Sequence, residues 1–187
     1  MPPIETLPLP EDPTLAAYAA VLNETGHWAT VRDAQWREVF VTDELRRAHG
    51  EQPDSVPQGV GEHRFGPSEV AIMETIYAGD WMQSVRRAFR EQGPFILFDT
   101  PGGRDELRRV VDPALRDLVD EIEPVESPPI WRGVEVMIKH SGSSAKNRGL
   151  NMRIYDGAGT FVGTIFLAKP GPGMSQLAAA AGLADRD

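Results

Sequence analysis

Four histidines, His27, His49, His63 and His140, are the side chains here that most readily bind a metal or transfer a proton near neutral pH. No two of them stand four residues apart, the helical spacing that brings two ligands to one metal ion. No acidic residue occupies a supporting position beside them. The chain also contains no cysteine, which excludes disulfides, cysteine nucleophiles and zinc–thiolate sites. We therefore predict no metal site.

Hydroxyl nucleophiles and phosphate-binding glycines are the next candidates for chemistry. Three serines follow His140 in the run HSGSSAKNRG, but no strand–turn–helix elbow surrounds them, and the run is typical of a polar loop between strands. The glycines of TPGGRDEL, residues 100–107, precede a predicted helix and could face an anion. The lysine and spacing of a phosphate-binding loop are missing, and Asp105 and Glu106 would repel the anion. We predict no catalytic residue.

Four residues are candidates for lining a ligand pocket: Tyr77, Trp81, His140 and Met152. Tyr77 and Trp81 belong to a helical stripe that should face a sheet, where they either fill the core or line a pocket. His140 either ends a strand and reaches water, or contacts a ligand. Haem is one such ligand, with His63 as a second possible axial residue. Because the expected inner face consists of Val, Ile, Met and Leu, an apolar small molecule fits it best.

These positions depend on the elements that carry them, beginning with a helix and two strands. Residues 13–25 form a predicted amphipathic helix, with Asp12 as its N-cap and Pro13 at its first position. Residues 28–34 and 36–42 are rich in β-branched and aromatic side chains and predict two strands joined by a tight turn. Thr42 then caps a helix that starts at Asp43.

The middle of the chain is predicted to be helical after an irregular loop. Residues 50–67 hold four glycines and three prolines, so we expect a loop that is either functional or disordered. A helical region over 68–92 stops at Gly79 and restarts with Asp80 as cap. The apolar run PFILFD, residues 94–99, predicts an additional buried strand. Residues 104–122 predict a helical segment that Pro113 interrupts.

The last block predicts three strands, near residues 131–140, 148–156 and 160–168, the last two joined by a hairpin turn at Asp156–Gly159. Together with the early pair they make a five-stranded antiparallel sheet, and the helical middle covers one of its faces. The predicted class is α+β.

This arrangement resembles a PAS domain. In that family two early strands lead into short helices, and three late strands complete a five-stranded sheet with an Asp–x–x–Gly turn, here Asp156, Gly157, Ala158 and Gly159. The string GHWATVRDAQWREVFVTDELRRAHG, residues 26–50, also resembles the N-terminal region of certain actinobacterial adenylate/guanylate cyclase proteins. The resemblance implies a sensor or regulatory domain ahead of a class III nucleotide cyclase. No cyclase catalytic motif is present, so no enzyme activity is implied for this chain.

The resemblance also implies an organisation. Residues 1–11 would be a flexible Pro-rich lead-in, residues 12–170 the PAS-like domain with an enlarged helical middle, and residues 171–187 a linker and the start of a truncated exit helix. A homodimer is expected through the helix at 13–25 and an outer sheet face that bears Trp131 and Met137. The alternative is a ligand-free dimerisation or scaffold module with a filled core.

Composition and net charge limit the binding partners and the cellular location that we expect. The formal net charge of −9 repels phosphate backbones, so nucleic acid is not an expected partner. The N-terminus lacks the charged and apolar regions of a signal peptide. No apolar run approaches the roughly 20 residues of a membrane-spanning helix. We expect a cytoplasmic protein without membrane association.

Overall fold

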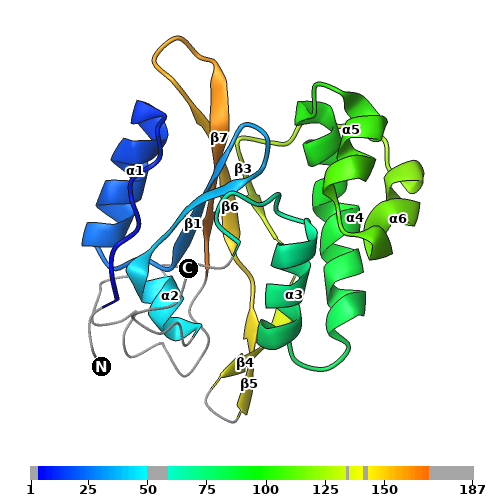
Figure 1. The fold of residues 1–187 in the computed structure, drawn as a ribbon, viewed down its shortest axis with the longest axis horizontal. Helices are drawn as coiled ribbons and strands as arrows, with labels where there is room; N and C mark the ends of the chain where they lie inside the picture. The colour runs from blue at the N-terminus through cyan, green and yellow to red at the C-terminus, as the bar shows by residue number, and fades with distance from the viewer. Residues whose placement is uncertain (1–3, 50–58, 134, 141–142, 169–187) are drawn as a thin grey trace.

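Five strands form one antiparallel sheet in the computed structural model, which describes residues 4–49, 59–133, 135–140 and 143–168. Their order across the sheet is β2 (Glu38–Val41), β1 (Ala29–Asp33), β7 (Phe161–Leu167), β6 (Leu150–Tyr155) and β3 (Ile130–Arg132). The early pair therefore lies directly beside the last strand, with β7 at the centre (Figure 1). The fold is α+β with a five-stranded antiparallel sheet, which confirms the predicted class.

Helices lie on both sides of this sheet (Figure 1). The middle of the chain covers one face with α3 (Pro67–Ile76), α4 (Trp81–Asp99), α5 (Gly103–Val110), the 3-10 turn η1 (Pro113–Leu115) and α6 (Arg116–Glu121). The N-terminal helix α1 (Pro13–Glu24) covers the other face, and the short α2 (Asp43–Ala48) follows β2. Two apolar clusters result, one beneath α1 and one among α3–α6.

The helix boundaries follow from local capping. The Asp12 carboxylate accepts hydrogen bonds from the Thr14 and Leu15 amides at the start of α1. Asp80 accepts from the Gln83 amide, so the predicted stop and restart between α3 and α4 is confirmed. The interruption predicted at Pro113 is confirmed as well, because Asp112 caps a separate short turn there.

The tight turn between β1 and β2 is held by Asp33, whose carboxylate accepts from the Gln35 and Arg37 amides. Trp36 closes this turn with a φ of 60°, a left-handed conformation that is uncommon for a bulky side chain. Its ring is 1% exposed, and its Nε1 donates to the Asp99 carboxylate at the end of α4 at 3.0 Å. A strained hairpin residue therefore joins the sheet to the helical layer.

The extra strand predicted for residues 94–99 is wrong, because α4 runs through Pro94 to Asp99. An interior proline removes one helical hydrogen bond and normally disfavours the helix by about 3 kcal/mol. Here the apolar stripe continues past it, and Ile96 and Leu97 are buried in the helical cluster. Tertiary burial of that stripe outweighs the local cost.

The single strand predicted for residues 131–140 is divided in two. Residues 130–132 form β3 in the main sheet, whereas β4 (Val136–His140) pairs with β5 (Ser143–Asn147) in a separate two-stranded sheet. The serine-rich run, predicted to be a loop, therefore supplies a strand. His140 pairs with Ser143, and so short a connection favours local antiparallel pairing over joining the distant sheet.

The two faces of the main sheet differ sharply in chemistry. Val31, Ile165 and Met152 are cross-strand partners on the face beneath α1. The next row, Arg32, Thr164 and Arg153, points to the opposite face, towards α3–α6. We call this second surface the polar face; its residues are Thr30, Arg32, Glu38, Trp131, Asn151, Arg153, Thr164 and Phe166.

Two segments of the predicted domain organisation, the N-terminal lead-in and the C-terminal linker with its exit helix, lie at or beyond the ends of the described residues. Ile4 is buried and the Thr6 hydroxyl donates to Asp43 at 2.6 Å, so this portion of the predicted lead-in lies against α2. The linker and exit helix predicted over 171–187, and residues 50–58 of the loop, lie outside the described residues. None of the described helices is long and apolar enough to cross a membrane.

Candidate functional site

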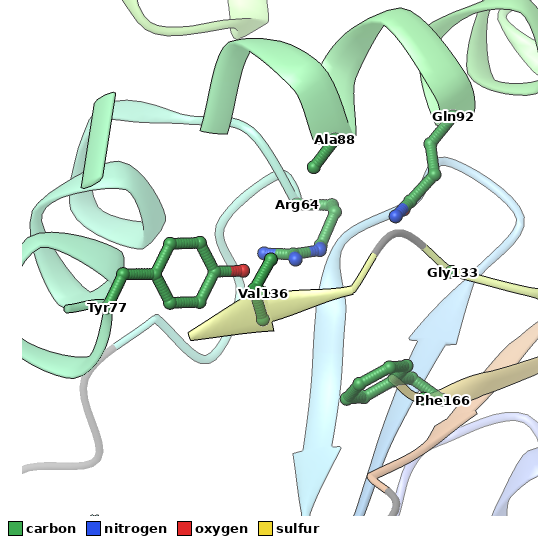
Figure 2. Close-up of a pocket in the computed structure, with 8 residues that line it drawn as sticks. Arg64, Tyr77, Ala88, Gln92, Gly133, Val136 and Phe166 are labelled. Carbon is green, nitrogen blue, oxygen red and sulfur yellow. The ribbon is translucent and has the colours of Figure 1, made fainter. Parts of the chain in front are cut away.

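A pocket lies between the helical layer and the strands that face it (Figure 2). Its volume is about 30 Å³, room for roughly two water molecules. Loop, helix and strand segments all contribute to its lining, which consists of Arg64, Tyr77, Ala88, Gln92, Gly133, Val136, Gly149 and Phe166.

Two glycines shape the strand side of this pocket. A side chain at Gly149 would overlap the Phe166 ring, because its Cβ would lie 1.8 Å from Cε2. Gly133 donates its amide to the Gly149 carbonyl at 3.0 Å, which holds the two segments together. The Arg148 Nε donates to the Gly133 carbonyl at the same distance, 3.0 Å. The pocket wall there is therefore backbone and one aromatic ring.

Buried ionisable side chains surround the pocket. Arg32 on β1 donates from Nε to Glu38 on β2 at 2.8 Å, and both side chains are less than 5% exposed. Arg64 is 13% exposed, and its Nη1 lies 3.8 Å from the Glu69 carboxylate, beyond hydrogen-bonding distance. Figure 2 shows the Tyr77 hydroxyl pointing towards the Arg64 guanidinium.

The local electrostatics leave an excess of positive charge. Burial raises the pKa of Glu69 to about 8, and Glu38 adds to this, while Arg64 and Arg32 oppose it. Burial, with Arg64 and Arg32, lowers the pKa of His63 to about 4. At pH 7 Glu69 is therefore mostly protonated and His63 neutral. Two guanidinium groups, which stay charged in proteins, then face the single ion-paired carboxylate of Glu38.

Unpaired polar atoms are concentrated in this layer. Within the residues that the structure describes, seven buried side-chain nitrogen and oxygen atoms have no hydrogen-bond partner. All seven belong to the polar face or to the loop and helix packed on it: Arg32 Nη1, Arg64 Nε, Gln92 Oε1, Trp131 Nε1, Asn151 Nδ2 and Oδ1, and Thr164 Oγ1. Native structures leave few such atoms, since each costs about 1–3 kcal/mol. Two of the residues concerned, Arg64 and Gln92, also line the pocket, so unpaired polar atoms border its interior.

The structure places the four predicted lining residues in different surroundings. Tyr77 lines the pocket. Trp81 is half-buried and packs against the helical apolar cluster. His140 belongs to β4, but the structure does not describe the position of its side chain. Met152 packs beneath α1 on the opposite face of the sheet, so the structure does not bring it to Tyr77.

The prediction that the apolar face of the sheet meets the helical layer was therefore wrong. Asn151, Arg153 and Thr164, rather than Met152 and Ile154, point towards α3–α6. Sequence reasoning missed these residues together with Arg32, Arg64 and Gln92. One signal was available: strand β1 reads Ala-Thr-Val-Arg-Asp, and a charged residue inside a buried strand requires a partner.

His63 has surroundings that suit a structural role. Its ring is buried, and its Nδ1 accepts a hydrogen bond from the Phe65 amide at 3.3 Å. It forms an isolated bridge with Arg37 along the outer edge of β2. Among the described residues no group of three His, Cys, Asp or Glu could hold a metal ion. Haem ligation by His63 or His140 stays a prediction, which Soret absorbance of the purified protein would test.

The early strand pair and the late strands share one antiparallel sheet, with a helical layer over one face. No protein-family model matches the chain, and no curated protein matches it. Among solved structures, the PAS domain of Bordetella pertussis BvgS is 12% identical, with a TM-score of 0.49, covering 90% of this chain and 93% of that one.

Two further solved structures are similar to this chain. A PAS domain from Colwellia psychrerythraea is 11% identical, with a TM-score of 0.40, covering 83% of this chain and 94% of that one. A C-terminal domain from Streptococcus mutans is 12% identical, with a TM-score of 0.39, covering 94% of this chain and 99% of that one.

Proposed function

We propose that this chain is a ligand-responsive regulatory domain, a sensor that binds a small molecule between its helical layer and the polar face of its sheet. The observation that carries this proposal is that two unpaired buried polar atoms, Arg64 Nε and Gln92 Oε1, belong to residues that line the pocket. A ligand that pairs with them would stabilise one arrangement of α3 and α4 over the sheet, and binding shifts an equilibrium only through such a difference.

The contact between α4 and the sheet offers a route for the response. Asp99 at the end of α4 bonds Arg153 on β6 and Trp36 in the β1–β2 turn. Gln92, two turns earlier on the same helix, lines the pocket. A ligand that moves Gln92 therefore acts on a helix whose far end is joined to β6 and to the β1–β2 turn.

A thermal-shift screen of small polar and apolar molecules against the purified domain tests this function. A ligand of the pocket raises the melting temperature, because it binds the folded state only. The same ligand should lose most of its effect on a Gln92→Leu variant and keep it on a variant of the exposed Arg90. A broad screen in which no molecule gives a pocket-dependent shift would refute the sensing role.

For the output of the sensor, we propose a nucleotide cyclase domain in the same polypeptide, as the resemblance of residues 26–50 implies. Cyclase activity of the full-length protein with ATP and GTP tests it. Absence of cyclic nucleotide from both substrates would exclude this output while leaving the sensing role intact. The chain itself would contribute regulation rather than catalysis.

The alternative is a dimerisation or scaffold module, and two observations favour it. The pocket volume of about 30 Å³ is far below the roughly 300 Å³ of typical ligand sites. Helix α1 also exposes Tyr18 and Val21. The dimer surface predicted from the sequence needs correction, since Trp131 is buried in the helical core and Met137 lies on the separate β4–β5 sheet. A homodimer would instead form through α1.

A further inference from the structure

We infer that the pocket selects a small carboxylate with a short apolar body, the carboxylate bound at Arg64 and the body packed against Ala88, Val136 and Phe166. This inference rests on the proposed ligand-binding role and specifies the ligand class. It also assigns Arg64 as the residue that determines specificity.

The charge of Arg64 is the first reason. Arg32 already has a close ionic partner, since Glu38 accepts its Nε hydrogen bond at 2.8 Å. Arg64 has none within hydrogen-bonding distance among the described residues, because the nearest carboxylate, Glu69, stands 3.8 Å away. Its partners are neutral instead: Nη1 donates to the Met73 Sδ at 3.7 Å, a weak acceptor, and the guanidinium hydrogen-bonds the Tyr77 side chain. An enclosed guanidinium without a close anion is a strong site for a carboxylate.

The orientation of the unpaired atoms is the second reason. Arg64 Nε is buried and unpaired, and it belongs to a residue that lines the pocket. Figure 2 shows the guanidinium and the Gln92 amide directed into the space between α4 and the strands. A carboxylate oxygen accepts from Arg64, while the unpaired Gln92 Oε1 accepts from a hydroxyl on the same ligand.

The remaining lining limits the shape of the ligand. Ala88, Val136 and the Phe166 ring supply apolar contacts, and the glycines at 133 and 149 supply backbone. The volume of about 30 Å³ admits only a few non-hydrogen atoms unless side chains shift. Phosphate esters and sugars are too large for this space. A carboxylate of two to four carbons, preferably hydroxylated, fits the charge and the polarity, and it enters only when lining side chains shift to enlarge the space.

Ionisation of Glu69 gives this site a pH dependence. The charged groups that face Glu69 are Glu38 and Arg32 from the strands and Arg64 and Glu62 from the loop before α3. When Glu69 loses its proton, its charge competes with the ligand for Arg64. Carboxylate affinity should therefore fall as the pH rises through about 8, where Glu69 ionises.

Calorimetric titration of the purified domain tests the inference with propionate, lactate and the neutral isostere propionamide. Propionate and lactate should bind and propionamide should not, with lactate the tighter of the two. Arg64→Met should weaken propionate binding about 10–100-fold, the loss expected for a charge-assisted pair. Arg90→Met, at an arginine that is over half exposed on α4, is the matched control and should leave the affinity unchanged.

A second variant keeps the inference testable if Arg64→Met fails to fold. Gln92→Glu keeps the shape of the side chain but places a negative charge in the pocket that Arg64 lines, so it should abolish propionate binding in a folded protein. Equal binding of propionate and propionamide would overturn the carboxylate inference. Binding of neutral apolar molecules alone would overturn it too, but leave the sensing role standing. Binding of no small molecule would remove both and favour the scaffold module.

Discussion

Replacing Asp99 by alanine should destabilise the domain by about 3–5 kcal/mol, the usual effect of removing one partner from a buried ion pair. The Asp99 carboxylate accepts from Arg153 Nη2 at 2.8 Å and Nη1 at 2.9 Å, and from Trp36 Nε1 at 3.0 Å. The side chains of the ion pair are only 3% and 4% exposed. Without Asp99, a guanidinium stays buried with neutral neighbours.

The neutral groups around Arg153 place the expected loss of stability for Asp99→Ala towards the lower end of the range of about 3–5 kcal/mol. Arg153 also donates to Ser127 Oγ at 3.1 Å and to the Tyr155 hydroxyl at 3.0 Å. Its guanidinium lies 3.8 Å from the centre of the Phe161 ring, a favourable cation–π contact. For a domain of this size, about 3 kcal/mol corresponds to a fall in melting temperature of roughly 6–12 °C.

Urea unfolding followed by circular dichroism measures this loss, and a paired variant tests its cause. The double substitution Asp99→Leu with Arg153→Met should cost less than Asp99→Ala, because no buried charge is left unpaired. Glu121→Ala is the control, since its pair with Arg90 is more than half exposed and contributes at most about 1 kcal/mol. A loss below about 1 kcal/mol for Asp99→Ala, or a double variant worse than the single, would refute the reasoning.

Three further predictions concern pH, packing and association. The Glu69 carboxyl keeps its proton up to about pH 8 in the folded state but only up to about pH 4.5 in the unfolded chain. The free energy of unfolding that Glu69 contributes therefore declines between these two pH values. Melting temperatures across that range should decline less steeply in Glu69→Gln. Phe89→Ala should cost about 3–5 kcal/mol and half-buried Trp81→Ala clearly less, by chemical denaturation; equal losses would contradict the packing described. Sedimentation equilibrium should show a dimer at high concentration that Val21→Glu, beside exposed Tyr18, converts to monomer; a monomeric parent protein would exclude it.

Local chemistry explains why much of the fold could be predicted. The hairpin at Asp156–Gly159 is visible in the sequence because Asp156 accepts from the amides of Ala158 and Thr160, all within a few residues. The caps at Asp12, Asp80 and Asp112 act over a similar range. Strand composition then located the early pair and the last two strands, and the antiparallel sheet was predicted from the order of strands and helices along the chain.

The candidate site was mostly beyond prediction, for a different reason. A strand that alternates apolar and polar residues shows that it has two faces, but not which face a given helix covers. Val31 and Arg32 are neighbours, yet one packs beneath α1 and the other is buried towards α3–α6 beside Glu38. From the sequence, the apolar side seemed the natural partner of the larger helical layer, which placed Met152 in the pocket.

The sequence by itself determined the class of fold and most element boundaries, since these depend largely on contacts between near neighbours. Tertiary structure alone decided that α4 continues through Pro94 and that Arg64 lines a pocket with side chains from α4, β4 and β7. The energy that settles each of these comes from segments far apart in the chain. A buried guanidinium such as Arg64 is tolerated only where distant groups surround it, and no local pattern specifies their meeting.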